Sequence, residues 1–302
     1  MGSQPGCGDD SSSSAAEQSA SQPGGATATD WTARLAEPTV ADLLAALAQP
    51  HATLRDAVGP HRLHTTTSFA LVPTTPSSAR PALDSPVVPS QAVEDELTLS
   101  WGTTAEQGVR LSLTQANDHD RGRDVVVIDE TIYVRQAHRG WFHYPRDSDL
   151  IEQWLDDAQR SAHDAVQLAA PRLSLHATPV PGEGLDGGPA VEIALALGET
   201  RDGAAIAAGP TQAWRDQAQI DAVTGAVRLD TVSGAWLSAD IDVSYSLSGP
   251  DGQPLQGRLH LKGDVVPGPP SPIQTPTASQ PLPQRQRYEQ QRRELLDGLA
   301  GP

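Results

Sequence analysis

The 302-residue sequence is poor in cysteine, aromatic residues and positive charge. Its single cysteine excludes an internal disulfide and a zinc site built from several thiolates. The 21 basic residues are outnumbered by 38 acidic ones, which gives a formal net charge of −17. Because contacts to nucleic-acid phosphates need a basic surface, this balance argues against nucleic-acid binding. No apolar run approaches the roughly 18–20 residues of a membrane-spanning helix.

The motifs of common enzyme classes are also missing. The sequence has no G-x-S-x-G elbow, no H-E-x-x-H and no Walker loop. Asp240 and Asp242 could act as paired carboxylates, but they alternate with serines in a pattern typical of a solvated strand face. We therefore expect a protein that is not an enzyme and needs no cofactor.

Nine histidines raise the possibility of a metal site. The run Asp118-His119-Asp120 offers three ligands, and His138 could meet His143 across a hairpin. Both groups lie in or beside polar turns, where these residues are ordinarily solvated. We therefore expect no metal site.

Composition divides the chain into four segments. Residues 1–29 are rich in serine, alanine, glycine and glutamine and are expected to form a disordered polar tether. Residues 30–266 carry regular hydrophobic patterns and are expected to form one α+β domain. Residues 267–283 contain seven prolines, which predicts an extended linker. Residues 284–302 place leucines at helical spacing among four arginines and three acids, which predicts a basic amphipathic helix.

Helical periodicity appears in three places within the domain. Thr39 and Asp42 form a candidate capping pair ahead of a leucine-rich helix, and a second helix over 51–58 should end at Gly59-Pro60. A long helix over 149–169 carries one continuous apolar stripe, and Asp149 with Glu152 is its candidate capping box.

Alternation of apolar and polar residues predicts the strands. They cover residues 63–71, 97–101, 109–113, 125–128, 131–135, 140–145, 173–177, 191–197, 227–231, 237–247 and 255–265. Sequential strands joined by short turns are usually antiparallel neighbours. We therefore expect roughly 8–11 antiparallel strands in one curved sheet, an open or incomplete barrel, covered on its apolar face by the amphipathic helices.

Three tryptophans fall where the sheet should meet the long helix. Trp101, Trp141 and Trp154 could simply fill the core. Alternatively, together with Ile151 and Leu155, they could line a cavity between helix and concave sheet, because a curved sheet with few aromatic residues is easily underfilled. The second interpretation predicts an apolar ligand such as a lipid or an acyl chain.

The segment Gly6-Cys7-Gly8-Asp9-Asp10-Ser11, with the polar tract after it, resembles the mature start of a bacterial lipoprotein. The resemblance implies lipid attachment at Cys7 and a place on the periplasmic side of the cell envelope. Residues 4–6 are Gln-Pro-Gly, where this class usually has an apolar residue three positions before the cysteine, and residues 1–6 contain no signal peptide. We therefore expect a signal peptide to precede Met1.

The body of the chain resembles the envelope lipoprotein-carrier class, which includes LolA-like and LppX/LprG-like proteins. The resemblance rests on the apolar hairpin at 125–134, the aromatic turn at 139–144 and the strand–turn–strand element at 230–237. It implies a curved, incompletely closed sheet under a helical lid, and non-catalytic lipid binding. An alternative is a structural or assembly lipoprotein that docks an envelope protein through its Pro-rich tail and terminal helix.

Overall fold

The computed structural model describes residues 31–74, 91–104, 108–119, 121–137, 139–200, 214–215, 217–249, 252–269 and 272–282. Three predictions fall outside these residues: the polar tether over 1–29, lipid attachment at Cys7, and the terminal helix over 284–302.

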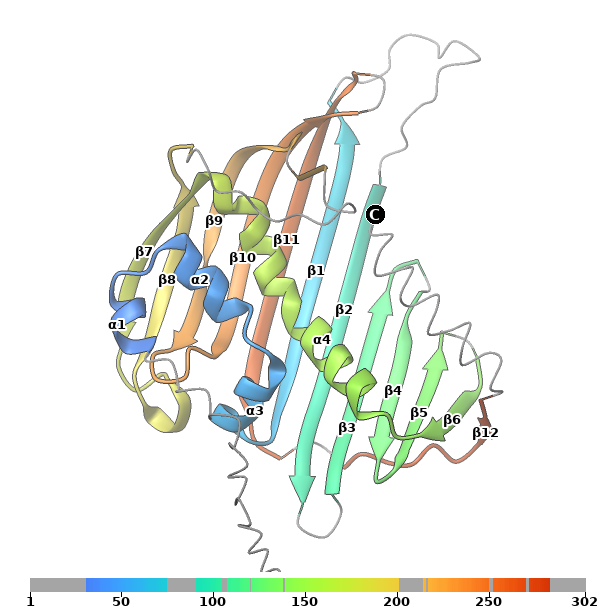
Figure 1. Ribbon diagram of the computed structural model, residues 1–302. Coiled ribbons are helices and arrows are strands. Elements are labelled where there is room, and N and C mark those ends of the chain that lie inside the picture. Colours follow the sequence, from blue (N-terminus) through green and yellow to red (C-terminus); the bar gives the residue numbers. More distant parts are fainter. Residues whose placement is uncertain are drawn as a thin grey trace, which may run out of the picture.

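In the described part of the chain twelve strands form one sheet, in the order β12-β6-β5-β4-β3-β2-β1-β11-β10-β9-β8-β7 (Figure 1). The strands are β1 (His61–Pro73), β2 (Gln91–Thr104), β3 (Gly108–Asn117), β4 (Arg123–Ile128), β5 (Thr131–Gln136), β6 (Trp141–Pro145), β7 (Leu173–Val180), β8 (Ala190–Leu197), β9 (Gln219–Asp230), β10 (Trp236–Ser248), β11 (Pro254–Pro267) and β12 (Ser279–Pro281). Two antiparallel meanders, β1–β6 and β7–β11, are joined where β1 pairs with β11. The last strand, β12, pairs in parallel with β6.

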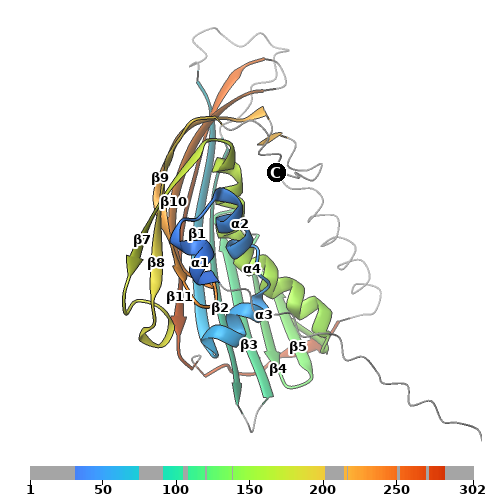
Figure 2. The same ribbon diagram turned by 60° about the vertical axis from the view of Figure 1, so that its left-hand side comes forward.

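The four α-helices of the described residues lie on one side of this sheet (Figure 2). They are α1 (Trp31–Ala36), α2 (Val40–Leu47), α3 (His51–Val58) and α4 (Ser148–Ala169), and short 3₁₀ turns occupy Ala170–Arg172 and Leu185–Gly187. The 22-residue α4 connects the two meanders and crosses the sheet diagonally (Figure 1). Its apolar stripe packs against β10 and β11, and Leu155, Ala162 and Val166 are fully buried.

The helix ends follow local sequence signals. The side chain of Thr39 accepts from the backbone N–H of Asp42 and the Asp42 side chain reaches back to Thr39, which confirms the predicted capping box. Gly59 ends α3 at φ 68°, as predicted. The predicted start of α4 is wrong by two residues. Asp147, in an extended conformation, caps this helix by accepting from the N–H of Leu150, whereas Asp149 already lies in the first turn.

The predicted fold class is wrong. We expected about 8–11 antiparallel strands in an open or incomplete barrel covered by helices, and the described residues instead form one large mixed sheet of twelve strands with few helices. The Pro-rich tail contributes the extra, parallel strand. The sheet ends at β12 on one side and at β7 on the other, and the four described helices leave much of its face without a helical cover (Figure 1). Alternation shows which face of a strand is buried, but it does not show whether two edges meet.

A buried carboxylate organises the turn between β9 and β10. Asp230 is 3% exposed. One carboxylate oxygen accepts from the backbone N–H groups of Val232 (3.2 Å) and Ser233 (2.8 Å) and from the Ser233 hydroxyl (2.7 Å). The other accepts from the N–H of Leu185 at 3.2 Å, which ties the β7–β8 connection to the same turn.

Replacing Asp230 with alanine is expected to lower the free energy of unfolding by about 2–4 kcal/mol, because several buried donors lose their acceptor together. Urea unfolding followed by circular dichroism measures this loss. Asp221→Ala on the exposed side of the same strand is the matched control and should change stability by less than about 0.5 kcal/mol. Equal effects of the two substitutions would contradict the role assigned to Asp230.

Candidate functional site

The structure does not gather the five predicted cavity residues around one space. Trp101, Ile151, Trp154 and Leu155 are buried in the hydrophobic core with at most 8% of their surface exposed. Trp101 lies on β2 beside His51 and His61, whereas the other three lie on α4. Trp141 is half-buried on β6, with the guanidinium of Arg135 4.8 Å from its ring centre. Trp154 alone among the five lines one of the described pockets.

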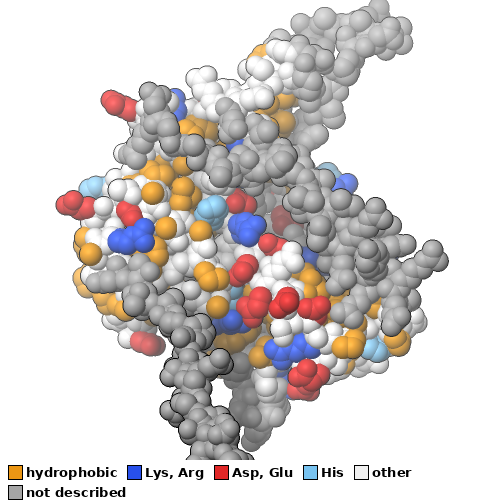
Figure 3. All heavy atoms as spheres, viewed as in Figure 1, with side chains coloured by type: hydrophobic (Ala, Val, Ile, Leu, Met, Phe, Trp, Pro, Cys, Tyr) orange, Lys and Arg blue, Asp and Glu red, His pale blue; other side chains and the backbone are white. Residues whose placement is uncertain are grey.

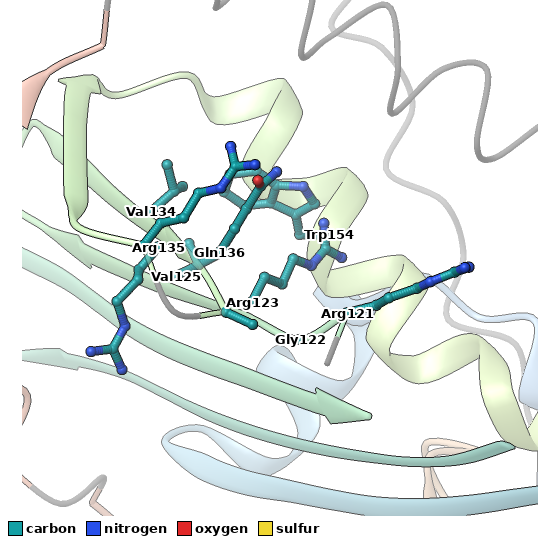
Figure 4. A pocket seen from close by; sticks show the side chains of 10 residues that line it. Arg121, Gly122, Arg123, Val125, Val134, Arg135, Gln136 and Trp154 are labelled. Carbon is teal, nitrogen blue, oxygen red and sulfur yellow. The ribbon is translucent and has the colours of Figure 1, made fainter. Parts of the chain in front are cut away.

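The pocket beside Trp154 has a volume of about 370 Å³ and carries four arginines (Figure 4). Its lining comes from the start of β4, the end of β5, the turns next to them and α4. The lining residues are Arg121, Gly122, Arg123, Val125, Val134, Arg135, Gln136, Ala137, Arg139 and Trp154. Four of the chain's 21 basic residues therefore surround one small hollow.

The backbone fixes the two turns that carry these arginines. The N–H of Ala137 donates to the carbonyl of Gly122 at 2.9 Å, which extends the β4–β5 pairing past both strands. A side chain at Gly122 would place its Cβ 2.5 Å from the carbonyl oxygen of Gln115 on β3, so the chain at Gly122 lies close against β3. Arg121 precedes β4 and Arg139 follows β5, so the two residues lie at the same end of the sheet.

Arg123 is the arginine most directly placed for ligand binding. Its guanidinium carbon lies 5.9 Å from the centre of the Trp154 ring, and its buried Nε has no hydrogen-bond partner. Desolvation raises the pKa of nearby Asp157, and the positive charges of Arg160 and Arg123 oppose that rise. Arg123 thus brings a partly desolvated positive charge against an aromatic face, with unused donor capacity.

Arg135 has a different role from the other arginines of the pocket. Its Nε and Nη2 donate to one carboxylate oxygen of Asp124 at 2.8 and 2.6 Å. Figure 4 shows its side chain pointing away from Trp154, toward the opposite face of the sheet. Arg135 therefore borders the hollow while its charge is compensated by Asp124, which leaves Arg121, Arg123 and Arg139 as the groups available to a ligand.

The pocket is a local exception to the charge of the surrounding surface. Acidic side chains gather along the exposed side of α4 (Figure 3), among them Asp149, Glu152 and Asp157. A guanidinium presents a planar fork of donors that matches a carboxylate or a phosphate. The floor of the pocket is apolar, formed by Val125 and Val134 with the indole of Trp154. The arrangement suits an anionic group joined to a small apolar portion.

The histidines and carboxylates considered for chemistry have structural partners. His119 lies within hydrogen-bond distance of the Ala92 carbonyl (2.9 Å), and His143 lies 3.0 Å from the Ser279 hydroxyl. Asp240 lies 3.2 Å from Nε2 of His260, and Asp242 accepts from Arg258, in both cases diagonally across the β10–β11 pair. Within the described part of the chain no three histidine, cysteine or acidic residues are grouped as a metal site would need. Asp120 and His138 lie outside the described residues.

Sequence reasoning missed the arginine pocket. Its signal was nevertheless present, because Arg121 and Arg123 precede one strand of the predicted hairpin, while Arg135 ends the other strand and Arg139 follows it. Antiparallel pairing brings the start of the first strand to the end of the second. The predicted hairpin is therefore sufficient to bring the four arginines together at one end of the sheet.

Comparison with known proteins gives a structural likeness but no family. No family model matches the sequence, and no curated protein matches it significantly. A chain from "The complex structure of Pseudomonas aeruginosa MucA/MucB" is 18% identical, with a TM-score of 0.23; the match covers 78% of this chain and 61% of that one. A likeness of this size carries no argument about family or function. No described helix is long and apolar enough to cross a membrane.

Proposed function

We propose that this protein is a non-catalytic binding protein whose ligand joins a carboxylate or phosphate to an apolar portion. The observation that carries the proposal is the arginine pocket beside Trp154, in a chain whose net charge is −17. Clustered positive charge in an acidic protein disfavours the folded chain through local repulsion, and a bound anion would relieve that repulsion. The volume of about 370 Å³ lies at the lower end of the range for small-molecule sites.

The lipid or acyl chain expected from the sequence enters this proposal as an amphiphile bound by its head group. The space between α4 and the sheet is occupied by side chains such as Leu155 and Val166, which are fully buried. The arginine pocket has room for an anionic head and for the first methylenes against Val125 and Val134. Each methylene buried there would contribute about 0.8 kcal/mol.

Three probes separate the parts of this proposal. Inorganic phosphate tests the anion site alone, octanoate tests a carboxylate with an alkyl chain, and octyl phosphate combines the phosphate with the chain. Octyl phosphate should bind at least about tenfold more tightly than inorganic phosphate, because burial of two methylenes is worth roughly that factor. Octyl glucoside, which has the chain without the charge, should not bind measurably.

The variant Arg123→Gln is expected to weaken octyl phosphate binding by at least about tenfold, the effect of losing one charge-assisted hydrogen bond. Isothermal titration calorimetry of the full chain measures the dissociation constant, and circular dichroism checks the fold. Arg62→Gln is the matched control, since Arg62 is an exposed arginine on β1, away from the pocket. Binding that is absent with all the anionic probes, or unchanged in Arg123→Gln, would overturn the proposal.

We propose that this binding protein lies in the cell envelope and carries a lipid attached at Cys7. This part rests on the resemblance of residues 6–11 to a mature lipoprotein start. Labelled palmitate should enter the protein in its native host and should be lost in Cys7→Ser. Equal labelling of the native chain and of Cys7→Ser would contradict the lipid anchor, but it would leave the proposal about the arginine pocket unaffected.

A further inference from the structure

The tail of the chain completes the sheet as a separate, minimal strand. After β11 ends at Pro267, about eleven residues lead to β12, which pairs with β6 through the register Ser279↔Trp141, Gln280↔Phe142 and Pro281↔His143. Every other strand pair in the described sheet is antiparallel and joins strands of at least five residues. The edge of β6 is thus covered by an extended segment of three residues.

Specific side-chain and backbone contacts hold this segment. The N–H of Leu282 donates to the carbonyl of His143 at 2.9 Å, and the His143 ring lies 3.0 Å from the Ser279 hydroxyl through Nδ1. Leu282 is partly buried against the hydrophobic core, next to the end of β12. The edge of β6 therefore recognises an extended peptide by the main-chain pairing of Ser279–Pro281, one further main-chain hydrogen bond, one hydroxyl and one leucine, which is the pattern of strand addition to a sheet edge.

The connection to β12 allows this recognition to occur between molecules. Residues 268–278 could span roughly 36–40 Å when extended. Within one molecule this length takes the tail past the five strands between β11 and β6, and it would equally reach the β6 edge of a neighbour placed at a similar distance. Pro269, Pro272 and Pro276 lack a backbone N–H, so this connection cannot continue the β11 ladder, and proline favours extended conformations. Release of the tail must open the three-residue pairing, the contacts of Leu282 and Ser279, and a hydrogen bond of 3.4 Å that Arg110 donates to the carbonyl of Ile273.

We infer that the edge of β6 also binds the tail strand of a second copy of this chain, so that two copies exchange their β12 strands and form a symmetric dimer. The second copy supplies the same Ser279–Leu282 segment, which is already complementary to this edge. Reciprocal exchange of an identical element closes with two-fold symmetry and needs no new interface. The linked tail competes at an effective concentration of about 1 mM, so exchange is expected at high protein concentration.

A disulfide trap tests this inference in the full chain. One copy carries Cys7→Ser and Gln280→Cys, and the other carries Cys7→Ser and Phe142→Cys, so that a register pair is divided between two molecules. The copies are mixed at about 0.2 mM, in enough salt to screen their negative charge, and oxidised slowly. The yield of covalent heterodimer should be about fivefold higher than in a control mixture in which Val232→Cys takes the place of Gln280→Cys. Val232 is 65% exposed on the β9–β10 turn.

Two further variants make the outcome decisive. Adding Leu282→Asp to the Gln280→Cys copy should return the yield to the level of the Val232→Cys control, because the charged side chain opposes docking. If Phe142→Cys does not fold, the neighbouring register pair of Trp141→Cys with Ser279→Cys replaces it. A yield no higher than that of the Val232→Cys control, together with an intramolecular disulfide when both cysteines are in one chain, would overturn exchange between copies.

Discussion

Replacing Gly225 with alanine is expected to lower the free energy of unfolding by about 3–5 kcal/mol, enough to unfold much of the population of a marginally stable domain. Gly225 lies in β9 at φ +131°, a backbone conformation that residues with side chains rarely adopt. A Cβ at this position would lie 2.0 Å from the carbonyl oxygen of Asp240 on β10. Neither atom can yield without separating two paired strands, because both belong to the ladder that joins β9 to β10.

A second glycine separates the two causes of the lost stability, which are backbone strain and the clash of the added Cβ. Gly182 also has a positive φ, +78°, but a Cβ there would meet no atom within 4 Å. Gly182→Ala should therefore cost about 1 kcal/mol, the strain of the backbone alone. Urea unfolding of both variants measures the difference. Equal losses would show that the close approach of β9 to β10 is not what requires glycine at 225.

The effect of Gly225 matters for the site because the two meanders stabilise one another. The pocket arginines lie in the β1–β6 meander, whereas Gly225 lies in the β7–β11 meander. They are connected by α4, which carries Trp154 into the pocket and packs its apolar stripe on β10 and β11. A change that separates β9 from β10 disturbs the surface on which α4 rests, and we expect it to weaken ligand binding as well as stability.

Local periodicity was sufficient to predict most of the strands. The run from Leu237 to Leu247 alternates strictly, and it forms β10 with Ile241, Val243 and Tyr245 buried. The strand over 125–128 also formed as predicted, because a continuous apolar run is typical of a strand buried on both faces. In these places residue burial and the two-residue period of a strand point to the same structure.

The overall fold was not predictable by the same reasoning. β12 lies in a segment whose prolines predict an extended linker, and its pairing depends on Leu282 reaching the core and on the free edge of β6. Neither condition is visible in the local pattern. The long α4 was predicted apart from its start, but its position as a diagonal crossover between two meanders depends on the pairing of β1 with β11, which are nearly 200 residues apart.

The candidate site was likewise predictable only in part. The pattern placed Ile151, Trp154 and Leu155 on the apolar side of a helix, and the structure buries all three. Periodicity indicates that a side chain faces the interior, but it does not indicate whether the interior is filled. The arginines lie at strand ends, where no period operates, and they became a group only through the pairing of β4 with β5.

Acidification is expected to destabilise the protein through a buried pair of histidines. His51 in α3 and His61 in β1 are both fully buried, and their Nε2 atoms lie 3.1 Å apart. His61 Nδ1 donates to the Gly59 carbonyl at 2.7 Å, so in its neutral form its Nε2 must accept from the Nε2–H of His51. His51 Nδ1 is then a bare acceptor, and it has no partner.

The pKa shifts of this pair set the pH range of the effect. Burial, followed by the positive charges of His61 and Arg55, lowers the pKa of His51 from the ordinary value of 6.5 to about 3. Burial also lowers the pKa of His61, although its bond to the Gly59 carbonyl opposes the change. Below pH 6.5 the unfolded chain binds protons that the folded chain does not. Stability is therefore complete above pH 6.5 and falls as the pH is lowered toward 3.

Between pH 7.5 and 5.0 the native protein should lose up to about 1.4 kcal/mol of unfolding free energy per pH unit below 6.5 for each histidine. The double variant His51→Gln/His61→Gln, whose amides do not titrate, should lose much less over that interval, even if it is less stable at pH 7.5. His176→Gln, at an exposed position on β7, should behave as the native protein does. Urea unfolding at the two pH values decides the matter: an equal loss in all three proteins would assign the acid sensitivity to groups other than this pair.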